Sequence, residues 1–327
     1  MGEPSPIRLR ANGAFIPRNN SSEETMKQLL AVLLGATAMT ATAQAEDISA
    51  VVEAANAQLL AAGHNVQIGM VEWINNGETE QMGQTILFKD VGNKQLGFDF
   101  VPGDPRRGGR TDIRHRTDGT EPSADAVDTF GAIASAMQTW QDVSCSDIPL
   151  TDLGLTPGDI GFIQSLIPGF GGNPGIGEPI IAGADVSHAG VLPGAWFDAA
   201  FGPNSILGVT FTIIFVDDMG NPTDIDNNGT NDAAYREIYY NDAFVWVNDP
   251  DDGPGNGVID LESVALHEAG HGLSQAHFGN AAIINSNGKI RISPKAVMNA
   301  GYIFAQQDLQ GSDVGGHCSN WSNWPIN

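Results

Sequence analysis

Apolar residues recur along this chain with periods that predict individual helices and strands. The clearest helical period, with steps of three and four residues, spans about 123–143 and gives this helix one buried face. The positions on that face are Val127, Phe130, Ile133, Met137 and Trp140. A second helix is predicted over 260–273, where Asp260 is a good N-cap, and a third over 47–62.

Runs rich in β-branched and aromatic residues predict strands. The predicted strands are 66–74, 84–88, 206–216 and 235–247. Residues 168–195 are rich in glycine and proline and are predicted to be loop, whereas 101–110 reads as a linker or an exposed loop. Helices mixed with hairpin-compatible strands predict an α/β or α+β fold, and we place a domain boundary after residue 104.

The first 45 residues have the composition of processing signals. Lys27 precedes a short apolar run, and a small-x-small sequence ends at Ala45, which together predict a signal peptide over 26–45. The run is shorter than the roughly 20 apolar residues of a membrane span, so no stable anchor is expected after cleavage. Residues 1–25 are then an over-extended N-terminus, and 46–104 are an N-terminal segment and a candidate pro-segment.

The chain is strongly acidic, with a formal net charge of −24. This charge repels nucleic acids and anionic membranes, which excludes both as partners. We expect a secreted protein, with the periplasm as the alternative location and a monomer as the favoured state. In such an oxidising space, Cys145 and Cys318 are predicted to form a disulfide, with two free thiols as the alternative.

Three histidines and a glutamate lie in or just after the predicted helix 260–273. His267 and His271 are one helical turn apart, so both imidazoles project from one face and can bind one metal ion. His277 follows the expected helix end and supplies a third ligand if the chain turns back, which leaves a fourth zinc position open. Glu268 can accept a proton from a water whose pKa zinc lowers. The alternative is a chance pattern of hydrogen-bonded core histidines.

This pattern resembles the HExxHxxGxxH signature of the metzincin metallopeptidases, and most closely the matrixin-like bacterial secreted peptidases. Met298, within an Ala-Val-Met-Asn sequence, is similar to the Met-turn of that family, with an ordinary core methionine as the alternative. The resemblance covers about 105–317 and makes 105–327 a matrixin-like metallopeptidase domain. It implies a zincin fold, with a twisted, mostly parallel sheet of five strands, an antiparallel edge strand that pairs with extended substrate, an active-site helix and a Met-turn subdomain. It also implies zinc-dependent endopeptidase activity on proteins or peptides, with Glu268 as the general base.

The sequence departs from this family pattern in two places. Ser274 stands where the signature has a glycine, and a serine in the same left-handed turn costs roughly 1 kcal/mol or more. Residues 46–144 contain no cysteine, so the cysteine that keeps many matrixins latent is absent. Asp104 is similar to an aspartate that another metzincin branch uses for latency. It is either such a switch, released by cleavage near Arg106-Arg107, or a simple loop carboxylate.

Oxygen-bearing residues at alternate positions around Gly229 have the spacing of a calcium loop. The candidate ligands are Asp224, Asp226, Asn228, Thr230 and Asp232. Tyr235 stands where the closing glutamate is expected, although Glu237 is close, and a solvated acidic turn is the alternative. A weaker calcium site just before the predicted helix 260–273 consists of Asp252, Asn256 and Asp260.

Three functions are compatible with these residues. The first is a zinc endopeptidase, and the second is a non-peptidase zinc hydrolase that uses the same helix. The third is a catalytically inactive, zinc-binding adhesive module, against which the intact Glu268 argues. His188 either belongs to a second, structural zinc site or is an ordinary hydrogen-bonded histidine.

Overall fold

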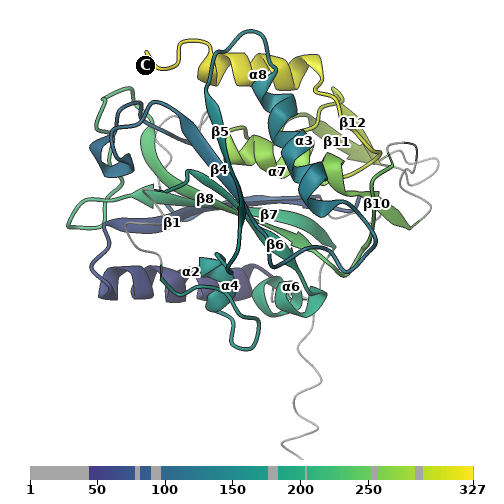
Figure 1. The fold of residues 1–327 in the computed structure, drawn as a ribbon, viewed down its shortest axis with the longest axis horizontal. Helices are drawn as coiled ribbons and strands as arrows, with labels where there is room; N and C mark the ends of the chain where they lie inside the picture. The colour runs from purple at the N-terminus through teal and green to yellow at the C-terminus, as the bar shows by residue number, and fades with distance from the viewer. Residues whose placement is uncertain are drawn as a thin grey trace, which may run out of the picture. The chain divides into compact units, whose positions relative to one another are not determined.

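Eight strands form a mixed sheet at the centre of the protein (Figure 1). The computed structural model describes residues 44–77, 82–89, 97–175, 183–202, 205–249, 251, 257–283 and 290–326. The strand order is β2-β1-β7-β8-β6-β4-β5, and β3 pairs with β8 beside this path. The predicted over-extended N-terminus, 1–25, and most of the predicted signal peptide lie outside the described residues.

The parallel part of the sheet comes from the middle of the chain. Its strands are β4 (Ile113–Asp118), β5 (Leu150–Thr156), β6 (Val186–Leu192) and β8 (Asn231–Asn241). These four run parallel to one another, and β7 (Ile206–Phe215) is antiparallel to β8. The fold is therefore mixed α/β with a mostly parallel central sheet, which is compatible with the predicted α+β class.

The residues before 104 contribute three further strands. They are β1 (Val66–Asn75), β2 (Thr85–Leu87) and β3 (Phe98–Asp99). β1 pairs antiparallel with β7, and β2 pairs antiparallel with β1. The expected sheet of five strands is therefore wrong, because the N-terminal segment extends it. The antiparallel edge of the sheet is the short β2, whereas β7 is paired on both sides.

Helices cover both faces of this sheet (Figure 1). On one face lie α3 (Thr129–Gln141), α7 (Leu261–Gly272) and α8 (Gly311–Trp321), and on the other α2 (Gln44–Ala61), α4 (Phe162–Ser165) and α6 (Gly194–Phe201). Each face encloses its own core, and β1 contributes to both: Met70 and Ile74 pack in the first core, Val71 and Trp73 in the second. The alternation of a strand explains this division.

The prediction of loop over 168–195 is wrong at its C-terminal end. Residues Val186–Leu192 form β6, and all seven are buried, because β6 lies between β4 and β8. A strand buried on both faces shows no polar alternation, so it lacks the pattern that identifies strands. Gly190 adds a second misleading signal, but its φ of +126° and its close approach to Glu121 explain why glycine stands there.

The prediction of a linker over 101–110 is also wrong. Residues 44–327 form one compact unit, and this segment is an internal turn that contains a short 3-10 helix, Pro105–Arg107. Asp104 caps this helix by accepting from the backbone N–H of Arg106, and Arg107 is fully buried. The alternative, an exposed loop, holds in part: Gly103, Pro105, Gly108 and Gly109 are exposed, whereas the arginines are held by ion pairs.

The remaining elements are short. They are β9 (Val245–Val247), β10 (Val258–Asp260), β11 (Asn280–Ile283) and β12 (Ile290–Ser293), so the predicted strand 235–247 is divided between β8 and β9. Cys145, just after α3, is disulfide-bonded to Cys318 in α8, with Cα atoms 5.6 Å apart. None of the helices in the described part of the chain has the length and hydropathy needed to span a bilayer.

Candidate metal centre

Two of the candidate metal ligands lie on the buried helix α7. Asp260 begins it as the N-cap, and its side chain accepts from the backbone N–H of Ser263 at 2.9 Å. His267 and His271 lie one turn apart, and both are fully buried. Gly270 lies between them because there is no room for a side chain: a Cβ there would lie 2.3 Å from the sulfur of Met298.

The three histidines converge through their Nε2 atoms. His271 Nε2 lies 3.1 Å from His267 Nε2 and 3.2 Å from His277 Nε2. The structure thus brings together all three histidines that the sequence analysis identified, although His277 comes from the loop after the helix. Three nitrogen donors at this separation form a set that could hold one metal ion.

Hydrogen bonds on the opposite side of the rings fix which nitrogen faces the centre. His267 Nδ1 lies 2.7 Å from the carbonyl oxygen of Val297, and His271 Nδ1 lies 2.8 Å from that of Gln275. A carbonyl accepts only, so both Nδ1 atoms carry a proton, which leaves Nε2 as the atom of each ring that can bind a metal ion. Burial also lowers the pKa of His267 and His277 well below the usual value, which keeps their rings neutral. Facing lone pairs repel unless a cation lies between them, so this donor set fits a zinc ion.

The turn that brings in His277 has the left-handed backbone expected for the family glycine. Ser274 has a φ of +64°, so the serine adopts the strained conformation rather than avoiding it. Its hydroxyl accepts a hydrogen bond of 3.0 Å from Arg236, whose other guanidinium nitrogen donates to the carbonyl of His271. Arg236 is buried and also donates to the carbonyl of Phe98, and its hydrogen bond to the serine hydroxyl offsets part of the backbone strain.

Ser274→Gly is expected to change the free energy of unfolding by less than about 1 kcal/mol. Relief of about 1–2 kcal/mol of left-handed strain offsets the lost hydrogen bond to a charged donor. Ser274→Ala keeps the strain and loses the hydrogen bond, so it is expected to lower stability by about 2 kcal/mol. Urea denaturation of both variants measures the difference. A Ser274→Ala variant as stable as the wild type would show that the Arg236 contact contributes nothing, and equal stability of the two variants would show that the left-handed strain does not.

Glu268 is held beside the three histidines by the strand β7. Its Oε2 accepts a hydrogen bond of 2.6 Å from Thr210, whereas Oε1 is buried and has no hydrogen-bond partner among the described residues. Gly208 makes room for it, since a Cβ there would lie 2.8 Å from Glu268 Cγ. Burial raises the pKa of Glu268 to about 7, while Thr210 and the charge on His271 lower it. One oxygen is fixed and the other is free, as a group that accepts a proton requires.

Met298 lies in the turn whose Val297 carbonyl contacts His267. It is 2% exposed, and its sulfur packs against Gly270 of α7. The buried carboxylate of Asp313 holds this turn, because its two oxygens accept from the backbone N–H groups of Val297 and Met298 at 2.9 and 3.1 Å. The same turn positions the Val297 carbonyl that contacts His267. Asp313 is a further residue of this site that was not predicted from the sequence.

Two further residues that the sequence analysis missed reach the histidines from the N-terminal strands. Glu72 of β1 is 1% exposed, and its Oε2 lies 3.2 Å from His271 Nδ1. Thr85 of β2 lies 3.3 Å from His277 Nδ1 and donates to Glu72 Oε1 at 3.1 Å. Burial alone would lower the pKa of His271, but Glu72 and Glu268 raise it above its usual value. No local motif marks these residues, since they are more than 180 positions from His271 and His277 in the sequence.

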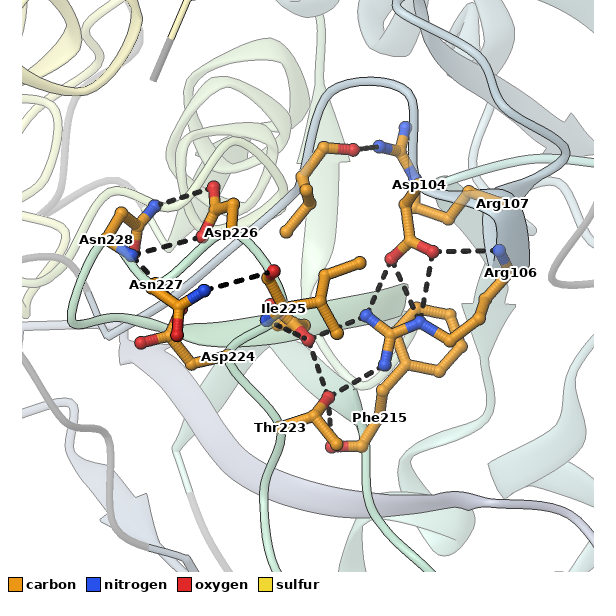
Figure 2. Close-up of polar contacts among 12 residues, drawn as sticks. Asp104, Arg106, Arg107, Phe215, Thr223, Asp224, Ile225, Asp226, Asn227 and Asn228 are labelled. Atoms are coloured by element: carbon orange, nitrogen blue, oxygen red, sulfur yellow. Dashed lines mark hydrogen bonds and ion pairs between the residues drawn. The ribbon is translucent and has the colours of Figure 1, made fainter.

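The predicted calcium loop around Gly229 brings three carboxylates together. Oxygens of Asp224, Asp226 and Asp232 lie within 4.8 Å of one another. Figure 2 shows Asn228 beside Asp226, with a hydrogen bond of 3.1 Å between the two side chains. Asp99 of β3 adds a fourth carboxylate that the sequence analysis missed, and burial followed by the charges of Asp226 and Asp232 raises its pKa to about 7. Clustered carboxylates of this kind favour a cation.

Several residues predicted as calcium ligands, or close to that loop, bind protein groups in the structure. Asp232 also forms an ion pair of 2.6 Å with Arg106, and Glu237 is buried against Tyr239 and Ile163 rather than closing the calcium loop. In the weaker calcium site, Asp252 and Asn256 lie outside the described residues, and Asp260 is the N-cap of α7.

Asp104, the candidate latency switch, and His188, the candidate ligand of a second zinc site, both bind other side chains. The carboxylate of Asp104 is bound by Arg106 through Nε and a terminal nitrogen at 2.7–3.1 Å, as Figure 2 shows, and it is not among the groups around the three histidines. Asp104 is therefore not the latency switch that the sequence allowed. His188 is a hydrogen-bonded core histidine, with Nδ1 2.7 Å from the hydroxyl of Tyr240.

No model of a known protein family matches this chain, and no curated protein matches its sequence.

Proposed function

We propose that this chain is a zinc-dependent endopeptidase of the metzincin kind, similar to the matrixin-like secreted peptidases. The observation that carries the proposal is the convergence of three histidine Nε2 atoms beside a glutamate with one free oxygen. The left-handed turn at Ser274 and the packing of Met298 under α7 support the same family.

Each side chain of this centre has a distinct task in peptide hydrolysis. His267, His271 and His277 would hold the metal, and zinc bound there would supply the Lewis acidity that acidifies a water molecule and polarises a peptide carbonyl. Glu268 Oε1 accepts the proton of the attacking water, while Thr210 keeps the carboxylate oriented through Oε2. The same group can hold this proton and then release it to the leaving amine.

We also propose a structural calcium ion at Asp224, Asp226 and Asp232, with Asp99 beside them. The spacing of the loop around Gly229 and the close approach of these carboxylates support it. Without a cation these groups repel one another, so calcium would stabilise the turn between β7 and β8. Protein or peptide substrates and a secreted location belong to the same proposal, and the disulfide between Cys145 and Cys318 is consistent with export.

Selective metal removal tests both proposals. A zinc chelator such as 1,10-phenanthroline is expected to abolish cleavage of an internally quenched peptide, and added zinc to restore it, because the histidines hold the reacting centre. A calcium-selective chelator such as EGTA is expected to lower the thermal midpoint by several degrees. Cleavage that survives complete zinc removal would contradict the proposed peptidase. An unchanged thermal midpoint in EGTA would contradict the calcium site.

A further inference from the structure

The strand β1 lies beside the metal centre, between two segments that flank it. On one side it pairs antiparallel with β7, with Glu72 opposite Thr210 and Ile74 opposite Gly208. On the other side Asn75 forms a parallel bridge with Gly301, and its carbonyl accepts from the backbone N–H of Tyr302 at 2.8 Å. Figure 1 shows β1 inside the sheet, next to β7. β1 therefore lies between β7 and the segment 301–302, with its backbone bonded to both.

Residues of β1 also contact the groups that would carry out the reaction. The carboxylate of Glu72 lies 3.2 Å from His271, and the backbone N–H of Ile74 faces the carboxylate of Glu268. Thr210 and Gly208, the β7 residues that position Glu268, are the direct partners of Glu72 and Ile74. An extended peptide lying here is in register with both the metal ligands and the general base.

An endopeptidase binds its substrate as an extended strand added to an open sheet edge. The open edge nearest this centre would be β7, but in the folded chain its hydrogen-bonding groups are taken by β1. The segment 300–302 is likewise occupied. A substrate strand and β1 need the same main-chain partners, so the two cannot bind at once.

We propose that β1 is an internal occupant of the substrate groove and that the folded chain is latent until β1 leaves β7. The proposal rests on the proposed peptidase function. It differs from a device in which one side chain blocks a metal, because the whole strand occupies the groove through its backbone. Substrates would then enter in the same direction as β1, antiparallel to β7.

Contacts on the face of the sheet opposite to the histidines hold β1 in place. Trp73 points into the other core, where its ring lies 5.6 Å from that of Phe201. Asn56 of α2 accepts from the backbone N–H of Ile68 at 2.7 Å. The strand is thus anchored by α2 and α6, on the face of the sheet opposite to the histidines, and a change there can loosen β1 without touching the centre.

The test compares Trp73→Ala with Phe162→Ala in the zinc-loaded full chain. Both variants remove a large side chain from the same core, but Phe162 belongs to α4 rather than to β1. Trp73→Ala is expected to raise the initial rate of peptide cleavage by at least about tenfold over the wild type, and Phe162→Ala to leave it unchanged. Intact-mass measurement at the end of each assay verifies that the N-terminal residues are still attached.

Hydrogen exchange supplies a second measurement that needs no variant. Binding of a peptide hydroxamate, a metal-chelating substrate analogue, is expected to increase the exchange of the amides in 71–75. Hydroxamate binding that leaves these amides protected, or equal rates for the wild type and Trp73→Ala, would overturn the occupancy of the groove and leave the peptidase standing. If neither the wild type nor either variant cleaves any peptide, the proposed peptidase itself is wrong, and with it this inference.

Discussion

Glu268→Gln is expected to lower kcat/KM for peptide cleavage by about 10³-fold, without loss of bound zinc. The substitution keeps the size of the side chain and an oxygen that can accept from Thr210, so the site should remain folded. What it removes is the carboxylate oxygen that accepts the proton of the attacking water. An amide oxygen is too weak a base to replace it, which is why the loss should appear in catalysis and not in metal content.

Glu262→Gln on the same helix is the matched control. Glu262 lies in the first turn of α7 and contacts Ser135, away from the histidines. It should leave kcat/KM unchanged, because it touches no group of the metal centre. Both variants are assayed in the preparation in which the wild-type chain cleaves, with zinc measured by elemental analysis. Equal cleavage by the wild type and Glu268→Gln would show that the activity belongs to another site or to a contaminant.

The metal centre could be predicted from sequence because most of it is local. His267, Glu268 and His271 lie on one helix, so their spacing alone places their side chains. The turn to His277 is also local, and the sequence marked Ser274 as the residue that makes this turn costly. The compensation could not be seen, because Arg236 comes from β8, far away in the chain.

What the sequence could not provide is the contribution of strands that pair over long separations. Glu72 and Thr85 reach the histidines only because β1 joins β7, and strand pairing of this kind leaves no motif at either strand. The calcium loop likewise combines local residues with one that strand pairing brings in. Its own carboxylates could be predicted from their spacing, but Asp99 joins them through the pairing of β3 with β8.

Arg107→Met is expected to lower the free energy of unfolding by about 3–5 kcal/mol, the largest stability effect we predict. Arg107 is fully buried, and its Nε donates to Asp185 at 2.8 Å. One terminal nitrogen donates to the carbonyl of Val101 at 2.9 Å. Methionine retains the apolar stem of the side chain but leaves the fully buried Asp185 with Arg110 as its remaining cationic partner. The cost arises because a buried carboxylate that loses a partner has no water to replace it.

Arg114→Met is the matched control, since Arg114 forms its ion pair with Asp112 where both side chains are partly exposed. Exposed pairs contribute little, so this variant should cost less than about 1 kcal/mol. Urea denaturation with the disulfide intact measures both values. A linker would tolerate either substitution, so equal stabilities would mean that the segment 101–110 does not pack as described. A large, selective loss in Arg107→Met would also predict slow cleavage at Arg106-Arg107 in the folded chain, because a protease would first have to extract a buried arginine from its ion pair.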